Sequence, residues 1–168
     1  DPHCINADDV LQAVDEIMTK IGLHDWKVFI DDNMMVITTD NDRFISLPSN
    51  TSFIAKKLPG LLIHEVGVHA LRIENGHNQP FKVFSQGLPG YGFTEEGLTT
   101  FSEVKTGTIL QSDLNTYAGR IVAADSLCNG YSFYQVYEKL MDTTVFAPEQ
   151  AYQITIRAFR GGGYLKDI

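Results

Sequence analysis

The sequence is poor in features on which several classes of protein depend. It has two cysteines in 168 residues, Cys4 and Cys128, and they form no Cys-x-x-Cys pair. This excludes a disulfide scaffold and a cysteine-bound zinc cluster. Two such thiols are typical of a reducing compartment, so we expect a cytoplasmic protein. No uninterrupted apolar run approaches the roughly 18 residues that a transmembrane helix needs.

Basic residues are scarce as well. Lys and Arg together number 13, whereas Asp and Glu number 21, which gives a net charge of −8 at pH 7. Non-specific binding to nucleic acids and adsorption to anionic membranes both depend on basic surface. We therefore expect neither nucleic acid nor a membrane as a partner, and the composition leaves the oligomeric state open.

The chain also lacks internal repeats, low-complexity tracts and linkers rich in Pro or Ser. Apolar residues make up 43% of it, which is enough for a packed core. We therefore expect a single domain over residues 1–168. The sequence begins with Asp1-Pro2 and no Met, so we expect that the natural N-terminus is missing from it.

The order of hydrophobic patterns predicts an α+β fold. Apolar residues at helical spacing between Val10 and Ile21 predict a first helix, which Gly22 ends. Three short β-rich runs separated by Asp/Asn clusters then predict a small antiparallel meander. These runs cover residues 27–31, 34–38 and 43–47.

The rest of the chain is predicted to be mostly helical. Pro59 suits the first turn of a helix that runs to Glu74, and Thr94 suits the N-cap of another over 95–105. Three further helices are expected near the C-terminus, and a loop is expected over 77–93. The first of these three helices contains Leu114, and the second begins after a Ser132/Gln135 capping box. The third begins at Pro148 and ends at Gly161-Gly162-Gly163.

Residues 64–69 read His-Glu-Val-Gly-Val-His inside an otherwise apolar helix. Histidines four residues apart share one helix face and can bind one metal ion. His64 and His69 are five apart, which places them roughly 140° apart on a regular helix. A π-type widening absorbs the extra residue, and Gly67 lies where such a distortion costs least. We therefore expect π-type hydrogen bonding between Ile63 and Ala70.

A third ligand is sought downstream, because catalytic zinc sites have three protein ligands and one open position. The candidates are Glu95 and Glu96, at the start of the next predicted helix. Acidic residues in a first turn also stabilise the helix dipole without binding anything. Beside a histidine pair, a ligand role is the stronger interpretation.

Three motifs between Pro59 and Glu103 carry a family resemblance. They are His-Glu-Val-Gly-Val-His from His64, Gly-Leu-Pro-Gly from Gly87 and Thr-Glu-Glu-Gly-Leu from Thr94. In them the chain resembles the bacterial zinc metalloproteases that carry a Gln-Glu-Gly-Leu-Ala motif, and their eukaryotic relatives, the microtubule-associated tyrosine carboxypeptidases. The resemblance continues more loosely to the C-terminal end. Family members run past both ends of this chain, which implies that residues 1–168 are a catalytic core excised from a longer chain.

The resemblance implies a zinc ion, a gluzincin-like peptidase core and a set of site residues. His64 and His69 would bind zinc, Glu96 would be the third ligand, and Glu65 would be the catalytic carboxylate. Glu95 stands where the bacterial motif has Gln, so it remains a competing ligand. The implied core has a small antiparallel sheet, then an active-site helix, then a helical half.

Zinc-bound imidazoles normally donate their second N–H to a carboxylate or carbonyl. Glu95, Thr100 and Glu103 are the candidates for this supporting role. Thr100 and Glu103 follow Glu96 by one and two helical turns, although they equally fit the polar stripe of a half-exposed helix.

Candidates for substrate binding are Arg72, Tyr91 and Arg160. A carboxypeptidase needs a cation for the terminal carboxylate of its substrate, which either arginine can supply. Arg72 fits equally well as the structural partner of a buried carboxylate. Tyr91 is a candidate by residue type for stabilising the transition-state oxyanion.

We therefore expect a zinc-dependent peptidase that acts on a peptide or a protein tail, with carboxypeptidase-like action as one form. The alternative is a zinc-stabilised binding or regulatory module without turnover, and the presence of Glu65 favours the enzyme. An exopeptidase of the dipeptidyl-peptidase type shares the histidine spacing but fits the Glu-Glu-Gly-Leu context poorly. The net charge argues against assuming an acidic substrate such as the tubulin tail. We expect the substrate to lie along an edge of the small sheet.

Overall fold

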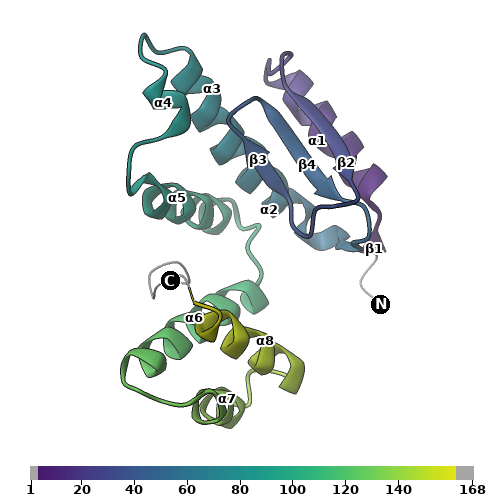
Figure 1. The fold of residues 1–168 in the computed structure, drawn as a ribbon. Helices are drawn as coiled ribbons and strands as arrows, with labels where there is room; N and C mark the ends of the chain where they lie inside the picture. Colours follow the sequence, from purple (N-terminus) through teal and green to yellow (C-terminus); the bar gives the residue numbers. More distant parts are fainter. Residues whose placement is uncertain (1–3, 162–168) are drawn as a thin grey trace. The chain divides into compact units, whose positions relative to one another are not determined.

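The computed structural model describes residues 4–161, which form an α+β structure with a small sheet and several helices. The chain forms two compact units, Asp1–Ile109 and Leu110–Ile168. Within the described residues, all of the strands belong to the first unit, and the second is helical (Figure 1). Two compact units can belong to one folding domain, so the single domain stays a prediction.

The first helix forms as its sequence predicts. Helix α1 (Ala7–Lys20) begins at a capping box in which Asn6 and Asp9 each accept the other's backbone N–H. This satisfies two backbone donors that a helix start otherwise leaves unpaired. The buried face of α1 includes Val10, Val14 and Met18.

The sheet is mixed, so the expected antiparallel meander is wrong. Its strands are β2 (Lys27–Asp31), β3 (Thr38–Asp40) and β4 (Phe44–Pro48), in the order β2-β4-β3. Strand β4 runs antiparallel to β3 but parallel to β2. Two further short strands, β1 (Cys4–Ile5) and β5 (Phe53–Ile54), form a separate antiparallel pair.

Burial explains this strand order. Strand β4 is the most apolar of the three, and Ile45 and Leu47 are both fully buried. A central position protects such a strand from water, whereas chain order alone would have placed it at an edge. The run expected as a strand over 34–38 contributes only its last residue, because Met35 and Val36 lie in an exposed bend.

One long helical run carries the histidine motif. It consists of η1 (Ala55–Lys57), α2 (Leu58–Leu62), the π-helix η2 (Ile63–Ala70) and α3 (Leu71–His77). The prediction of π-type hydrogen bonding is confirmed over its full range. Gly67 does not serve a close approach of another element, because an added Cβ would meet only the Leu62 carbonyl, at 3.9 Å.

The core of the first unit lies between the sheet and two helical segments, α1 and the α2–α3 run, which cover one of its faces (Figure 1). The buried side chains that meet there are Val10, Val14, Met18, Leu23, Trp26, Ile45, Leu47, Val66, Ala70 and Ile73. Because Val66 and Ala70 belong to the π-helix, packing against the core stabilises this unusual segment.

A glycine lets the chain turn back after α3. The segment expected as a loop over 77–93 contains the short helix α4 (Val83–Gln86), which packs against α3. A Cβ on Gly76 would lie 2.2 Å from the carbonyl oxygen of Phe84. Real side chains never approach so closely, so only glycine permits this contact.

Helix α5 (Tyr91–Thr106) starts one turn earlier than expected. Thr94 is therefore inside the helix, and the N-cap is Gly90 with a φ of 84°. This left-handed conformation suits glycine and turns the chain directly into the helix. The helix ends at Gly107, also left-handed.

The second unit contains α6 (Gln111–Cys128), α7 (Phe133–Asp142) and α8 (Pro148–Phe159). The capping box of Ser132 and Gln135 is confirmed, as is the start of α8 at Pro148. Its buried core residues are Ala123, Val136, Leu140, Ala151 and Ile154. Of the glycines expected to end α8, Gly161 follows the helix, whereas Gly162 and Gly163 lie outside the described residues, as does the rest of the C-terminal end. In the part of the chain from residue 4 to residue 161, no helix has the length and apolar character needed to cross a membrane.

An ion pair ties the β3–β4 turn to α3. Arg43 has a φ of 66°, which is unfavourable for a residue with a side chain. Its Nε lies 2.8 Å from Glu74 Oε2, its Nη2 lies 3.2 Å from Glu74 Oε1, and Trp26 donates to the same carboxylate at 3.1 Å. The hydrogen bond from Arg43, assisted by that from Trp26, outweighs burial and lowers the pKa of Glu74 below its ordinary value.

We expect this carboxylate to make folding stability depend on pH. Because its pKa is lowered in the folded state, its contribution is complete above the ordinary pKa and is lost as the pH falls through the lowered one. Glu74→Gln should reduce the free energy of unfolding at neutral pH, and the difference from wild type should close in acid. Urea unfolding across pH 3–7 measures this, with Glu16→Gln on the exposed face of α1 as the control. A difference that is constant with pH would contradict it.

Candidate metal centre

The π-helix brings the two histidines of the motif together. The ring centroids of His64 and His69 lie 4.9 Å apart. Both side chains are largely buried, with 26% and 14% of their surface exposed. Without the extra residue in the turn, the two rings would point to different sides of the helix.

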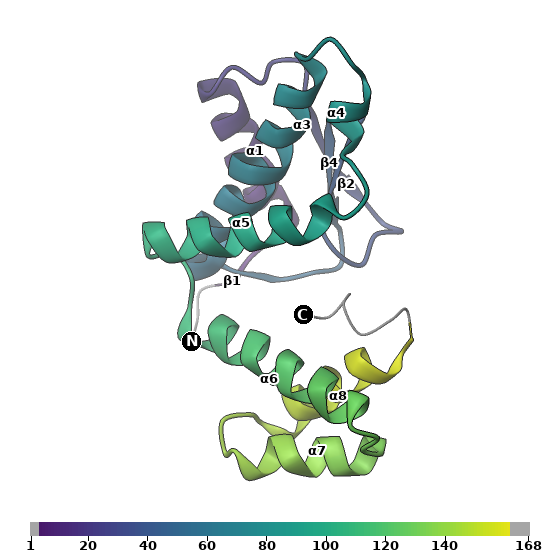
Figure 2. The same ribbon diagram turned by 90° about the vertical axis from the view of Figure 1, so that its left-hand side faces the viewer.

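Helix α5 packs across the π-helix and supplies Glu96 (Figure 2). Its Oε2 lies 3.7 Å from Nε2 of His64, and its Oε1 lies 3.7 Å from Nε2 of His69. One donor atom from each residue lies within 4.8 Å of the other two. Ligand atoms each about 2.0–2.1 Å from a tetrahedral ion are roughly 3.4 Å apart, so a small adjustment suffices for metal binding. These three side chains can therefore hold one metal ion.

The opposite nitrogens of both rings face buried carboxylates. His64 Nδ1 lies 3.0 Å from Glu103 Oε1, and His69 Nδ1 lies 3.1 Å from Glu95 Oε1. Glu95 and Glu103 are each 8% exposed and lie two turns apart on the buried face of α5. With Nδ1 donating to a carboxylate, each imidazole presents the lone pair of Nε2 to the metal position.

This geometry separates the roles of the two adjacent glutamates. Glu96 is 65% exposed and faces Nε2 of both rings, whereas Glu95 is buried behind His69. The structure thus groups Glu96, and not Glu95, with the histidines as candidate ligands. The hydroxyl of Thr100 donates to the backbone carbonyl of Glu96 and not to a ring. Of the three candidates for support of the rings, Glu95 and Glu103 therefore have this role.

Arg72 is the structural partner of a buried carboxylate, which is one of the two roles expected for it. Its Nε lies 2.8 Å from Glu95 Oε1, and its Nη1 donates to the backbone carbonyl of Ser85. The guanidinium carbon of Arg72 lies over the ring of Tyr91, 5.0 Å from the centre of that ring. Burial works against the ionised form of Glu95, but hydrogen bonds from His69 and Arg72 outweigh it and lower its pKa. Arg160, in contrast, lies at the end of α8 in the second unit.

Sequence reasoning missed one residue of the site, Thr39. Its hydroxyl lies 2.6 Å from Oε2 of Glu65 and donates to it. Thr39 is in the edge strand β3, which contacts the π-helix. A threonine in a strand carries no motif, so nothing in the local sequence distinguishes it.

The sequence matches the family model described as Microtubule-associated tyrosine carboxypeptidase over residues 1–168. The chain belongs to this family. This match includes both compact units of the chain. The helical second unit is therefore part of the sequence that the microtubule-associated tyrosine carboxypeptidase family shares. Comparisons with curated proteins and with solved structures returned no match.

We expect the bond between Arg72 and Glu95 to be essential for the stability of the site. Arg72→Met leaves a buried carboxylate with one partner fewer, which should lower the free energy of unfolding by about 3 kcal/mol. Adding Glu95→Gln to this variant removes the charge and should recover part of the loss. Urea unfolding of the metal-free single and double variants measures both effects. A double variant no more stable than Arg72→Met would show that the buried charge is not the cause.

Proposed function

We propose that the chain is a zinc-dependent peptidase with carboxypeptidase-like action on protein tails. One observation carries the proposal. Nε2 of both histidines and the carboxylate of Glu96 converge, while their supporting carboxylates lie on the opposite sides of the rings. Two imidazoles and one carboxylate are a typical ligand set of hydrolytic zinc sites. The family description supports action at a C-terminal tyrosine.

Zinc held there would polarise the scissile carbonyl and lower the pKa of a bound water towards about 7. The residues of the chain supply the proton transfers. Glu65 follows His64 directly. Burial works against the charged form of the His69 ring, but the hydrogen bond with Glu95 and then the nearby charge of Glu65 raise its pKa. Thr39 donates to Oε2 of Glu65, so we assign proton transfer to Oε1. Glu65 would accept the proton of the attacking water and deliver it to the leaving amine.

The sheet edge gives the substrate a place to bind. Strand β3 is the outer strand in the order β2-β4-β3, and its Thr39 is bonded to the catalytic carboxylate. An extended peptide can pair with an exposed strand edge through backbone hydrogen bonds, without a requirement on its sequence. We propose that the substrate lies along β3, which brings its scissile bond near Glu65.

The same arrangement supports a gluzincin-like core within a single catalytic domain. In that architecture a helix with two histidines is followed by a helix that supplies a glutamate. Here the π-helix and α5 have these roles. The alternative of a binding or regulatory module without turnover needs the ligands only, and the hydrogen bond that fixes Glu65 favours the enzyme.

We expect one zinc ion per chain, lost on removal of any ligand. His69→Ala and Glu96→Ala should each purify without stoichiometric zinc and melt at a lower temperature, because metal binding contributes to folding stability. Since Glu96 is 65% exposed, its replacement should leave the metal-free fold intact. Metal analysis by mass spectrometry measures this, with the exposed His24→Ala as control. Stoichiometric zinc in Glu96→Ala would contradict the ligand set.

We expect Glu65→Gln to keep zinc and the fold but to lose hydrolysis by about 10²- to 10⁴-fold, as for a general base. The assay uses peptides that end in tyrosine, each with a free and an amidated C-terminus. Cleavage of the free form alone indicates a carboxypeptidase, and cleavage of both an endopeptidase. Unchanged turnover in Glu65→Gln would refute the mechanism.

Thr39 provides a graded version of this test. Thr39→Val keeps the shape but removes the hydroxyl, which should lower kcat about ten-fold with little change in KM, since one hydrogen bond is lost. Thr39→Ser should restore most of the activity. Equal loss in both variants would indicate a packing role and no positioning of Glu65.

A further inference from the structure

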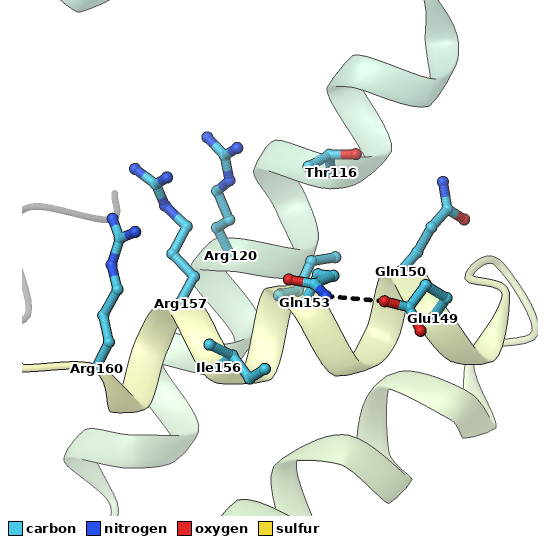
Figure 3. A pocket seen from close by; sticks show the side chains of 9 residues that line it. Thr116, Arg120, Glu149, Gln150, Gln153, Ile156, Arg157 and Arg160 are labelled. Atoms are coloured by element: carbon cyan, nitrogen blue, oxygen red, sulfur yellow. Dashed lines mark hydrogen bonds between the residues drawn. The ribbon is translucent and has the colours of Figure 1, made fainter. Parts of the chain in front are cut away.

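Arginine contacts stand out in each of the two units. In the second unit, an open pocket of about 350 Å³ lies between α6 and α8, and Arg120, Arg157 and Arg160 line it (Figure 3). Each of these arginines has interactions within the protein, so their grouping does not require a ligand. In the first unit, the contacts of Arg72 lead to the metal centre.

Arg72, in α3, connects three parts of the first unit. Its Nε lies 2.8 Å from Oε1 of Glu95 in α5, and its Nη1 donates to the backbone carbonyl of Ser85 in α4. The same Nη1 lies 3.4 Å from Oδ1 of Asn41, in the turn between β3 and β4. Asn41 therefore provides a contact between the sheet and this guanidinium.

The turn itself does not need the side chain of Asn41. Asn is common in turns because its side chain can bond to nearby backbone groups. Here Asp40 has that role, because its Oδ1 accepts from the backbone N–H of Asp42 at 2.9 Å. The carbonyl of Asp40 also accepts from the backbone N–H of Arg43 at 3.1 Å. The amide of Asn41 is thus left to contact Arg72.

Two contacts from α3 hold this turn in place. Nε2 of His77 lies 2.8 Å from the backbone carbonyl oxygen of Asn41. The next basic residue of the turn, Arg43, is paired with Glu74. The backbone of Asn41 is therefore fixed while its side chain contacts Arg72. A side chain presented from a fixed backbone can keep its partner in one orientation.

A single carboxylate oxygen links Arg72 to the metal centre. Oε1 of Glu95 lies 2.8 Å from Nε of Arg72 and 3.1 Å from Nδ1 of His69. Because both donors bind the same oxygen, a displacement of Arg72 changes the hydrogen bond that orients the imidazole. Glu95 is buried, so water cannot readily replace a donor that is lost.

We infer that Asn41 is a positioning residue for His69 and acts on that ring through Arg72 and Glu95. The inference rests on the proposed function, in which His69 is a metal ligand. Thr39, two residues before Asn41, donates to Glu65. Strand β3 and the turn after it thus contact both arms of the site, the carboxylate assigned to proton transfer and the support of one metal-binding ring. The strand proposed to bind the substrate is thereby held in register with both groups.

The first test uses the metal-free full chain and ¹⁵N NMR of the histidine rings at alkaline pH. Asn41→Leu removes the acceptor, which should lower the share of His69 rings that carry their proton on Nδ1, whereas Asn41→Asp should retain it. His64 is the internal reference, because Glu103 supports its ring. Equal changes at both rings would indicate a general loosening of the site and would overturn the inference, as would no change at His69. This measurement needs neither zinc nor turnover.

The second test measures zinc affinity by competition with a chelator. Asn41→Leu should weaken zinc binding about 3- to 10-fold, the effect of one hydrogen bond. Asn33→Leu, in the exposed turn after β2, should leave it unchanged. Added to Arg72→Met, Asn41→Leu should cause no further loss, because the link is already broken. Arg72→Lys serves if Arg72→Met is not folded, since a lysine can pair with Glu95 but lacks the planar fork that reaches a second partner.

Unchanged zinc affinity in Asn41→Leu would overturn the inference. Equal weakening by Asn33→Leu would do so as well, and so would an additive loss in the double variant. A wild-type chain that binds no zinc would refute the proposed ligand set instead, and the ring signals of the metal-free chain would then decide the role of Asn41.

Discussion

The spacing of two histidines is the constraint on which the first unit depends. His64 and His69 can face one ion only if the helix between them is wider than an α-helix, and the chain forms a π-helix over Ile63–Ala70. Hydrogen bonds of this type are less favourable than those of an α-helix, so the segment needs support. Val66 and Ala70 pack into the core on one side, and Gly67 lies on the exposed side without a side chain to crowd the turn.

Helix α5 completes the site because the glutamates on its exposed and buried faces have different partners. The exposed Glu96 faces Nε2 of both histidines, and the buried Glu95 and Glu103 each bind the far nitrogen of one histidine. Buried carboxylates are costly unless they are paired, and Arg72 supplies the second partner of Glu95. The charged groups around the two imidazole rings are thus held by one another, and they hold the rings in place.

The two units differ in their electrostatic character. The first unit has most of the acidic side chains of the chain and concentrates carboxylates around two histidines. The second unit gathers three arginines along one pocket. The family match covers both units. Each unit also has its own hydrophobic core.

The sequence by itself determined the features that depend on neighbouring residues. The histidine spacing required a π-helix, the Ser132/Gln135 box started α7, and the hydrophobic periods established an α+β class. Tertiary structure decided what depends on residues distant in sequence. The parallel pairing of β2 with β4 follows from burial of Ile45 and Leu47, which chain order does not show. Thr39 meets Glu65 across 26 positions, and only the packing of β3 on the π-helix brings a strand threonine to that carboxylate. Local patterns specify backbone geometry, whereas the partner of a side chain is set by which elements the core brings together.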